Sequence, residues 1–171
     1  MTIAVLCALA AASRVAFTFL PGFKPITAIV MVAGIALGPE AGFLTGAISA
    51  FASNFFFSQG PWTPWQMMAY GMAGLLAGAA VRRGRLPKKP WMLAIFGFLA
   101  MVTVVGVLLD CSTIFTTLTT IKWSSVLTVL TLGLRTNISH GIATAVTLLV
   151  FSKPLLEKLD RVKRKYGLLG S

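Results

Sequence analysis

One short stretch of the sequence holds most of the side chains that could recognise a small molecule. It reads SNFFFSQGPWTPWQM and supplies three amides and two indoles: Asn54, Gln59, Gln66, Trp62 and Trp65. Indoles offer flat apolar faces, and amides offer hydrogen bonds that orient a ring-containing ligand. The tryptophans could instead form an aromatic belt at a membrane interface. We favour a ligand site because the amides and two rigid prolines exceed what anchoring requires.

Two arginines interrupt segments that are otherwise apolar. Arg14 lies six residues before Pro21, and Arg135 lies twelve residues after Trp123. At a rise of about 1.5 Å per residue, these are depths of about 9 Å and about 18 Å. Charges at such depth in a membrane are costly and normally face a polar cavity or a partner. Asp110 is placed to pair with either arginine, so a structural ion pair is the alternative to a ligand cavity.

A third polar group consists of Asn137 and His140, which share one helix face at i, i+3 spacing. A lone histidine at membrane depth more often bonds a neighbouring helix, but with Arg135 nearby we include this group in a ligand pocket. An intramembrane enzyme using His140 and Asp110 would need a nucleophile, a second carboxylate or a metal set. Because the sequence arranges none of these, we predict neither an enzyme nor a metal site.

The composition defines the class of protein that carries these residues. Hydrophobic residues make up 57% of the 171 positions and charged residues 11%, less than half the charged share of a soluble domain. An ordinary soluble enzyme and a disordered chain are both excluded. We predict one transmembrane domain, 1–171, in a prokaryotic plasma membrane. The sequence has no GxxxxGK[ST] phosphate loop, so a partner must supply the energy for uphill transport.

Six apolar segments predict an all-α integral membrane protein, a bundle of six transmembrane helices. The predicted helices are 1–20, 26–38, 41–57, 65–81, 91–109 and 123–151, followed by a basic tail at 152–171. The second and third are short, so we expect a tight helical hairpin around Gly38. Three GxxxG pairs are expected to pack helices inside the bundle: Gly34/Gly38, Gly42/Gly46 and Gly74/Gly78.

The net charge of +11 is concentrated in two places. Basic residues gather in the 82–89 loop and in the 152–171 tail, and both flank apolar segments. The positive-inside rule therefore places these segments and both termini in the cytoplasm. The same charges attract anionic lipid headgroups, and their position argues against a nucleic-acid partner. The loops at 21–25, 58–64 and 110–122 then face outward.

Small residues recur along the first predicted helix. Ala4, Ala8, Ala12 and Ala16 are spaced by four and form one nearly straight ridge. Such a ridge lets another helix approach closely in lipid. Packing within this chain and docking of a different subunit are both open from the pattern alone.

Taken together, these features give the chain a family resemblance. It resembles the substrate-binding S components of energy-coupling factor (ECF) vitamin transporters over nearly its whole length, and within them the cobalamin-type group. The resemblance is carried by the alanine ridge and by three further segments: Phe19–Pro25, Ser53–Met67 and Leu159–Gly167.

The resemblance implies a six-helix S-component fold with cytoplasmic termini and an outward pocket that the outer loops close. It implies that Ala4, Ala8 and Ala12 dock on a transmembrane coupling subunit. Two ATPase subunits would then drive toppling of the S component and release of the vitamin inside. One departure is that family members usually begin with a short basic cytosolic lead, whereas this sequence starts inside the helix.

The leading hypothesis is therefore a high-affinity vitamin-binding subunit of an ECF importer, with a cobalamin-like ligand favoured. The vitamin is the transported ligand, and no cofactor is expected. The alternative is a structural or assembly subunit, whose polar residues would pair only with one another. The predicted substrate-binding residues are Arg14, Asn54, Gln59, Trp62, Trp65, Gln66, Asp110, Arg135, Asn137 and His140.

Overall fold

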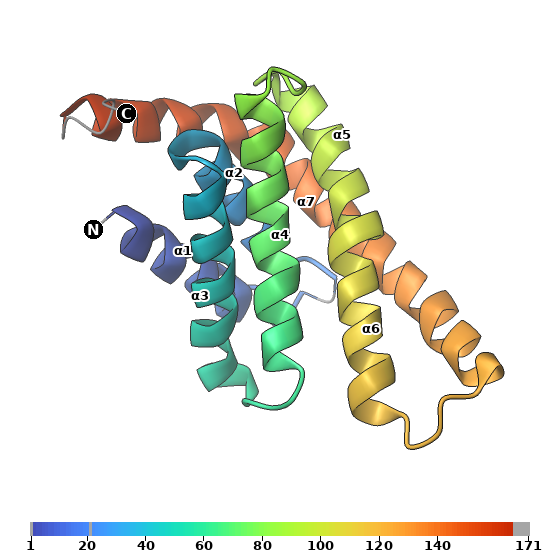
Figure 1. The fold of residues 1–171 in the computed structure, drawn as a ribbon. Coiled ribbons are helices and arrows are strands. Elements are labelled where there is room, and N and C mark those ends of the chain that lie inside the picture. The colour runs from blue at the N-terminus through green and yellow to red at the C-terminus, as the bar shows by residue number, and fades with distance from the viewer. Residues whose placement is uncertain (1, 21, 166–171) are drawn as a thin grey trace.

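The computed structural model describes residues 2–20 and 22–165, and this part of the chain is helical without strands. Because α5, a π-helical turn η1 and α6 form one continuous rod, the described residues form six rods, as predicted (Figure 1). The elements are α1 (Thr2–Ala16), α2 (Ile26–Leu37), α3 (Pro39–Phe57), α4 (Thr63–Arg82), α5 (Pro90–Ala100), η1 (Met101–Val105), α6 (Gly106–Thr117) and α7 (Trp123–Lys165).

Two helices end at other residues than predicted, and both differences change the geometry of the site. Helix α1 ends at Ala16, not at residue 20, and hydrogen-bonded turns follow it up to Phe23. The segment 110–122, expected as a loop, stays helical as far as Thr117. The hydroxyls of Thr113 and Thr116 donate to main-chain oxygens four residues earlier, so these polar side chains are satisfied inside the helix.

The predicted tail is also helical over most of its length. Helix α7 passes through Pro154 and continues to Lys165, while residues 166–171 of the predicted tail lie outside the described residues. This last part of α7 crosses the end of the bundle near the loop that joins α4 and α5 (Figure 1). The Lys163 ammonium donates to the Ala36 carbonyl at 2.6 Å. That bond ties the basic segment to the carboxyl end of α2.

Glycines bring the backbones of α2, α3 and α4 into direct contact, which confirms the packing role expected of the GxxxG pairs. A Cβ atom added to Gly42 would lie 2.6 Å from Gly34 Cα and 2.7 Å from the Gly74 carbonyl oxygen. Gly38 instead turns the chain between α2 and α3 with φ +106°, a conformation that favours glycine. Helix α2 is buried along its whole length up to Ala36. We name α2, α3 and α4 the glycine-packed half.

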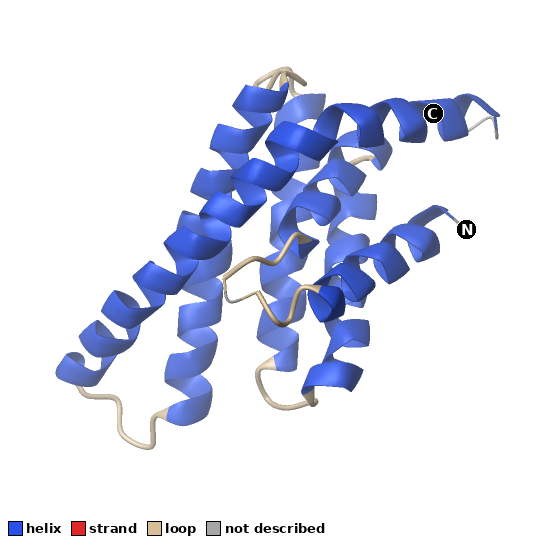
Figure 2. Ribbon diagram, turned by 180° about the vertical axis from the view of Figure 1, so that it is seen from behind, coloured by secondary structure: helices blue, strands red, loops and turns tan. Residues whose placement is uncertain are grey.

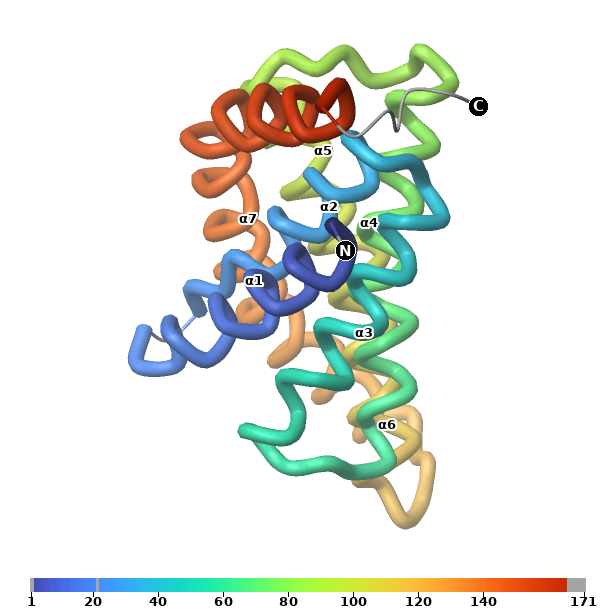
Figure 3. The backbone as a smooth tube through the Cα atoms, turned by 90° about the vertical axis from the view of Figure 1, so that its left-hand side faces the viewer, coloured from blue at the N-terminus to red at the C-terminus, as the bar shows by residue number. Residues whose placement is uncertain are grey.

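The remaining helices lie around this half at different angles. Helix α1 crosses α3 obliquely, and α7 runs the length of the molecule beside the α5–α6 rod (Figures 1 and 3). Within the described residues, one helical stretch, Pro90–Thr117, is long and apolar enough to cross a membrane by itself. Its outer face carries Trp91, Ile95 and Leu99, each more than half exposed. A bilayer favours such a stripe of large apolar side chains, and water does not.

Candidate functional site

A buried arginine organises the polar residues of three helices. Arg14, only 6% exposed, donates through Nη1 to Ser53 Oγ at 2.7 Å and to Asn54 Oδ1 at 2.9 Å. Its Nη2 donates to Gln66 Oε1 at 3.4 Å. We name Arg14, Ser53, Asn54 and Gln66 the Arg14 cluster. It brings together residues of α1, α3 and α4 that the sequence separates by up to 52 positions.

The guanidinium of Arg14 forms no ion pair with a carboxylate of the described residues. The Phe57 and Tyr70 rings lie 5.0 Å and 5.9 Å from its Cζ atom, so cation–π contacts replace an ion pair. Within residues 2–20 and 22–165, the ion pair that forms is Glu40 with Arg82, away from this cluster. Arg14 Nε is buried and has no hydrogen-bond partner among the described residues. A buried charge with neutral partners is suited to attract an electron-rich group.

The hydrogen bonds of the Arg14 cluster continue into the loop before α4. Asn54 Nδ2 donates to Thr63 Oγ1 at 3.1 Å, and the Thr63 hydroxyl donates to Gln59 Oε1 at 2.9 Å. Gln59 also donates to the Phe51 carbonyl at 3.1 Å, although its side chain is exposed. Asn54 and Gln59 therefore fix the turn that starts α4.

A second polar group lies between α6 and α7, and we name Asp110, Asn137 and His140 the Asp110 cluster. Asn137 Nδ2 donates to Asp110 Oδ2 at 2.9 Å, and among the described residues Asp110 forms no ion pair with Arg14 or Arg135, the alternative that the sequence left open. A glycine faces each partner: the Asp110 carboxyl packs on Gly133, and the Asn137 amide lies 2.5 Å from where a Gly106 Cβ would stand. These glycines make room for polar side chains between two helices.

The Asp110 cluster lines a hollow of about 350 Å³. All of its lining residues belong to α6 and α7, and the polar ones are Asp110, Thr113, Thr136, Asn137 and His140. The volume is at the lower end of the range of small-molecule sites, about 300–1,000 Å³.

The loop 17–25 lies against α7 beside this second cluster (Figure 2). Gly22 packs on the Ser139 side chain with φ +80°, and the next residue on α7 is His140. Lys24 of this loop and Arg14 of the first cluster are both near enough to His140 for their charges to act on it. Burial, and then the Arg14 charge, lower the pKa of the Lys24 ammonium.

Aromatic rings bridge α4 and α6 near the other loops. The half-buried Trp65 stacks on Phe115 with centroids 5.6 Å apart and an angle of 10° between the rings. Trp62 is 37% exposed and lies over Gly60 in the turn before α4. Phe115 was not among the predicted site residues because the hydroxyl-rich segment around it is typical of a loop.

Most of the predicted site residues thus gather into the two clusters and their borders, but Arg135 does not. Its side chain is exposed on α7 and is not among the residues that line the hollow. Ser53, Lys24 and Phe115 join the site without having been predicted. For Lys24 a signal existed, because it is part of the Phe19–Pro25 segment that carried the family resemblance.

The alanine ridge lies outside this polar region. Ala4, Ala8, Ala12 and Ala16 are all exposed, whereas Ala10 is fully buried on another face of α1. The rest of the described residues therefore leaves the ridge uncovered.

Comparison with known families decides between the functions that this geometry allows. The family model of the ECF-type riboflavin transporter, S component, matches residues 1–157. The chain belongs to this family. ECF S components are membrane-embedded, substrate-binding subunits that work with a transmembrane T component and ATPases. Comparisons with curated proteins and with solved structures give no match.

Membership in the riboflavin family confirms several predictions and corrects one. The chain is not an enzyme, and the vitamin is a transported ligand and not a cofactor. The structural-subunit alternative is not favoured. The predicted cobalamin-type subgroup is wrong, because the matching family is the riboflavin one. The stretch Ser53–Met67 carried part of the family resemblance, and within it Asn54, Thr63 and Gln59 bond one another in sequence.

Proposed function

We propose that this chain captures riboflavin, or a closely related flavin, for ATP-driven uptake by an ECF importer. The family match over residues 1–157 carries the proposal. The ligand site lies between the loop 17–25, the start of α4, and the α6–α7 pair. The loop contact of Gly22 on Ser139, next to His140, supports this location.

The chemistry of the two clusters suits a flavin. Its flat three-ring system has one apolar edge and one edge of alternating carbonyl and N–H groups. Asn137 and His140 provide donors and acceptors for the polar edge, and the unpaired charge of Arg14 favours a carbonyl-rich group nearby. Trp65, already stacked on Phe115, provides an aromatic face for the rings.

The size of the hollow also supports a flavin over a corrin. A volume of about 350 Å³ suits a compact heteroaromatic ligand, since small-molecule sites start at about 300 Å³. The loop 17–25 then acts as a cover, with Phe17 and Phe23 packed ring to ring at 5.2 Å.

Coupling to transport uses another surface. The exposed ridge of Ala4, Ala8 and Ala12 docks on the transmembrane coupling subunit, because exposed methyl groups allow close helix approach in lipid. Both termini and the basic 83–89 loop face the cytoplasm, in agreement with the positive-inside rule. Two ATPase subunits below the coupling subunit supply the energy.

Quenching of flavin fluorescence tests the ligand assignment directly. We expect the detergent-purified chain to quench riboflavin saturably, with thiamine and cobalamin failing to compete. Trp65→Ala should weaken binding about tenfold, because base–aromatic stacking contributes about 1–3 kcal/mol. Arg135→Gln is the matched control and should bind like the unmodified chain. Saturable competition by cobalamin, or no riboflavin binding by folded protein, would overturn the proposal.

Docking is tested separately from ligand binding. Ala8→Leu places a large side chain on the ridge and should abolish co-purification with the coupling subunit while riboflavin binding stays intact. Val107→Leu enlarges an exposed apolar residue on α6, away from α1, and serves as the control. Loss of riboflavin binding in Ala8→Leu would instead make the ridge a packing feature of this chain.

A further inference from the structure

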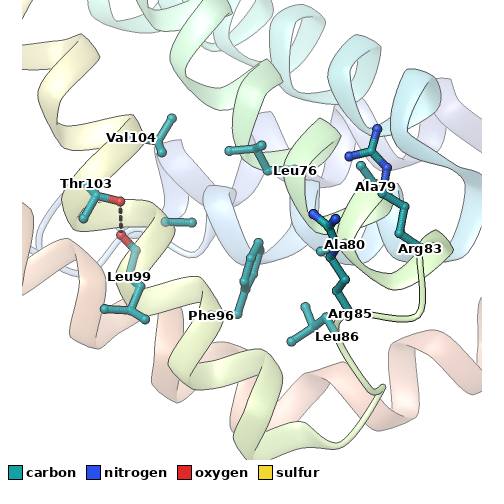
Figure 4. A pocket seen from close by; sticks show the side chains of 11 residues that line it. Leu76, Ala79, Ala80, Arg83, Arg85, Leu86, Phe96, Leu99, Thr103 and Val104 are labelled. Atoms are coloured by element: carbon teal, nitrogen blue, oxygen red, sulfur yellow. Dashed lines mark hydrogen bonds between the residues drawn. The ribbon is translucent and has the colours of Figure 1, made fainter.

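A groove separates α4 from α5 on the side of the molecule away from the Arg14 cluster. It encloses about 450 Å³ and ends at the turn that follows α4 (Figure 4). Residues of α4, α5, η1 and this turn line it, among them Leu76, Ala79, Phe96, Leu99, Val104 and Arg85.

The body of the groove is apolar although Thr103 lies in its wall. The Thr103 hydroxyl donates to the Leu99 carbonyl at 2.8 Å, so its hydrogen bond is used within its own helix (Figure 4). The residues that line the groove include no acid. A long hydrocarbon chain fits such walls, whereas a polar solute would lose hydrogen bonds to water.

The polar end of the groove is built by a glycine-dependent helix cap. Gly84, with φ +68°, donates from its main-chain N–H to the Val81 carbonyl, and Arg85 donates from its N–H to the Ala80 carbonyl, both at 3.0 Å. These two bonds form a Schellman motif. The motif fixes the backbone on which Arg83 and Arg85 stand, so both guanidinium groups border the same groove.

These two arginines hold charge that the chain itself does not neutralise. Both are exposed, and neither forms an ion pair within the part of the chain that the structure describes. Their neighbour Arg82 is the residue that approaches an acid, with 4.0 Å between its Nη1 and Glu40 Oε1. Two fixed guanidinium groups at one end of an apolar groove are complementary to a phosphate that carries an acyl chain.

We propose that this groove is a binding site for an anionic phospholipid. One acyl chain lies between α4 and α5 along Leu76, Phe96 and Leu99, and the phosphate lies between Arg83 and Arg85. A free phosphate would use the arginines but leave the groove empty, so the apolar walls favour a lipid. The site is separate from the proposed flavin site, and lipid binding here is independent of the transported ligand.

Native mass spectrometry of the full chain in detergent tests the proposal, with phosphatidylglycerol as the probe and phosphatidylcholine of the same acyl chains as the neutral reference. The unmodified protein should retain phosphatidylglycerol preferentially. The double variant Arg83→Gln/Arg85→Gln should bind it about thirty-fold more weakly, since each direct arginine–phosphate contact contributes about fivefold. Lys88→Gln/Lys89→Gln removes the same charge from the same loop but outside the groove, and it should lose less than threefold.

A second variant separates the groove from the charge. Ala79→Phe fills the groove and leaves both arginines in place, so it should also lose phosphatidylglycerol, while inorganic phosphate at the same concentration should not compete in any variant. Riboflavin binding, measured in all variants, reports correct folding. Equal retention of phosphatidylglycerol by the arginine and lysine double variants, or full retention by Ala79→Phe, would overturn the proposal.

Discussion

The glycine-packed half and the α6–α7 pair use glycine in opposite ways. In the glycine-packed half, Gly42 and Gly74 let one backbone rest on another, with no side chain between them. In the α6–α7 pair, Gly106 and Gly133 face the side chains of Asn137 and Asp110. The first arrangement gives close helix contact, and the second leaves space for polar groups beside a hollow.

The contrast shows how a small apolar chain can keep a polar site in a membrane. Backbone contact in one half fixes α3 and α4, which hold Asn54 and Gln66 around Arg14. The other half can then leave much of α7 exposed and open to a ligand, as the exposure of most of 123–136 shows. The glycine-packed half therefore supplies rigid support, and the α6–α7 pair supplies the open part of the proposed site.

The largest effect should come from adding one methyl group to each half. Gly74→Ala places a Cβ against the Gly42 carbonyl, so we expect the free energy of unfolding to fall by about 3 kcal/mol. Gly106→Ala places it against the Asn137 amide, which can move, so the loss should be about 1 kcal/mol. Unfolding in detergent followed by circular dichroism measures both. Equal losses would contradict the division into a fixed half and an adaptable half.

Loss of the buried charge should mainly affect binding. Arg14→Gln removes three hydrogen bonds from a charged donor, each of a type that contributes about 1.5–3 kcal/mol. We expect riboflavin affinity to fall by about thirty-fold, equivalent to about 2 kcal/mol. Titration of flavin fluorescence checks this, with Arg135→Gln as the control for loss of an exposed charge. An equal loss in both variants would remove Arg14 from the site.

The Asp110–Asn137 pair can be separated into its structural and its binding roles. Asn137→Leu leaves the Asp110 carboxyl without its partner and should lower stability by about 1.5 kcal/mol. In the double variant Asp110→Leu/Asn137→Leu, stability should recover because neither partner remains. Riboflavin binding should stay weak in both. Recovery of binding in the double variant would show that the pair only holds α6 to α7.

The smallest effect should come from the covering loop. Gly22→Ala adds a Cβ against Ser139 at a backbone angle that favours glycine, so the loop should seat less well on α7. We expect riboflavin to dissociate about fivefold faster, measured by stopped-flow fluorescence, with little change in stability. Ser139→Gly in the same protein should restore part of the slow release. An unchanged release rate in Gly22→Ala would separate the loop from the site.

Particular residues show how far the sequence could predict this arrangement. The six rods followed from the apolar segments, and the i, i+3 spacing placed Asn137 and His140 on one face of α7. The place of Arg135 outside the hollow follows from helix phase. Residues two positions apart on a helix differ by about 200°, so Arg135 points away from Asn137. The partner of Asp110 depends on where α6 meets α7, and Gly106 and Gly133 reveal that contact only once the helices are packed.

The segment 110–122 shows a second case in which the sequence alone did not predict the structure. Its threonines are typical of a loop, yet on a helix each hydroxyl can donate to the carbonyl four residues earlier, as Thr113 and Thr116 do. The identity of the vitamin was also difficult to predict from the sequence. The Ser53–Met67 stretch indicated the right family of transporters, but its amides hold the turn before α4, so they carried little information about the vitamin.

The most direct test of the central claim is a crosslink between the covering loop and α7. Gly22→Cys and Ser139→Cys, introduced after Cys7 and Cys111 are replaced by alanine, place two thiols at the contact that closes the proposed site. If riboflavin lies beneath this contact, oxidation after loading should trap it through gel filtration, and reduction should release it. Riboflavin that leaves the oxidised and reduced proteins at the same rate would contradict the account.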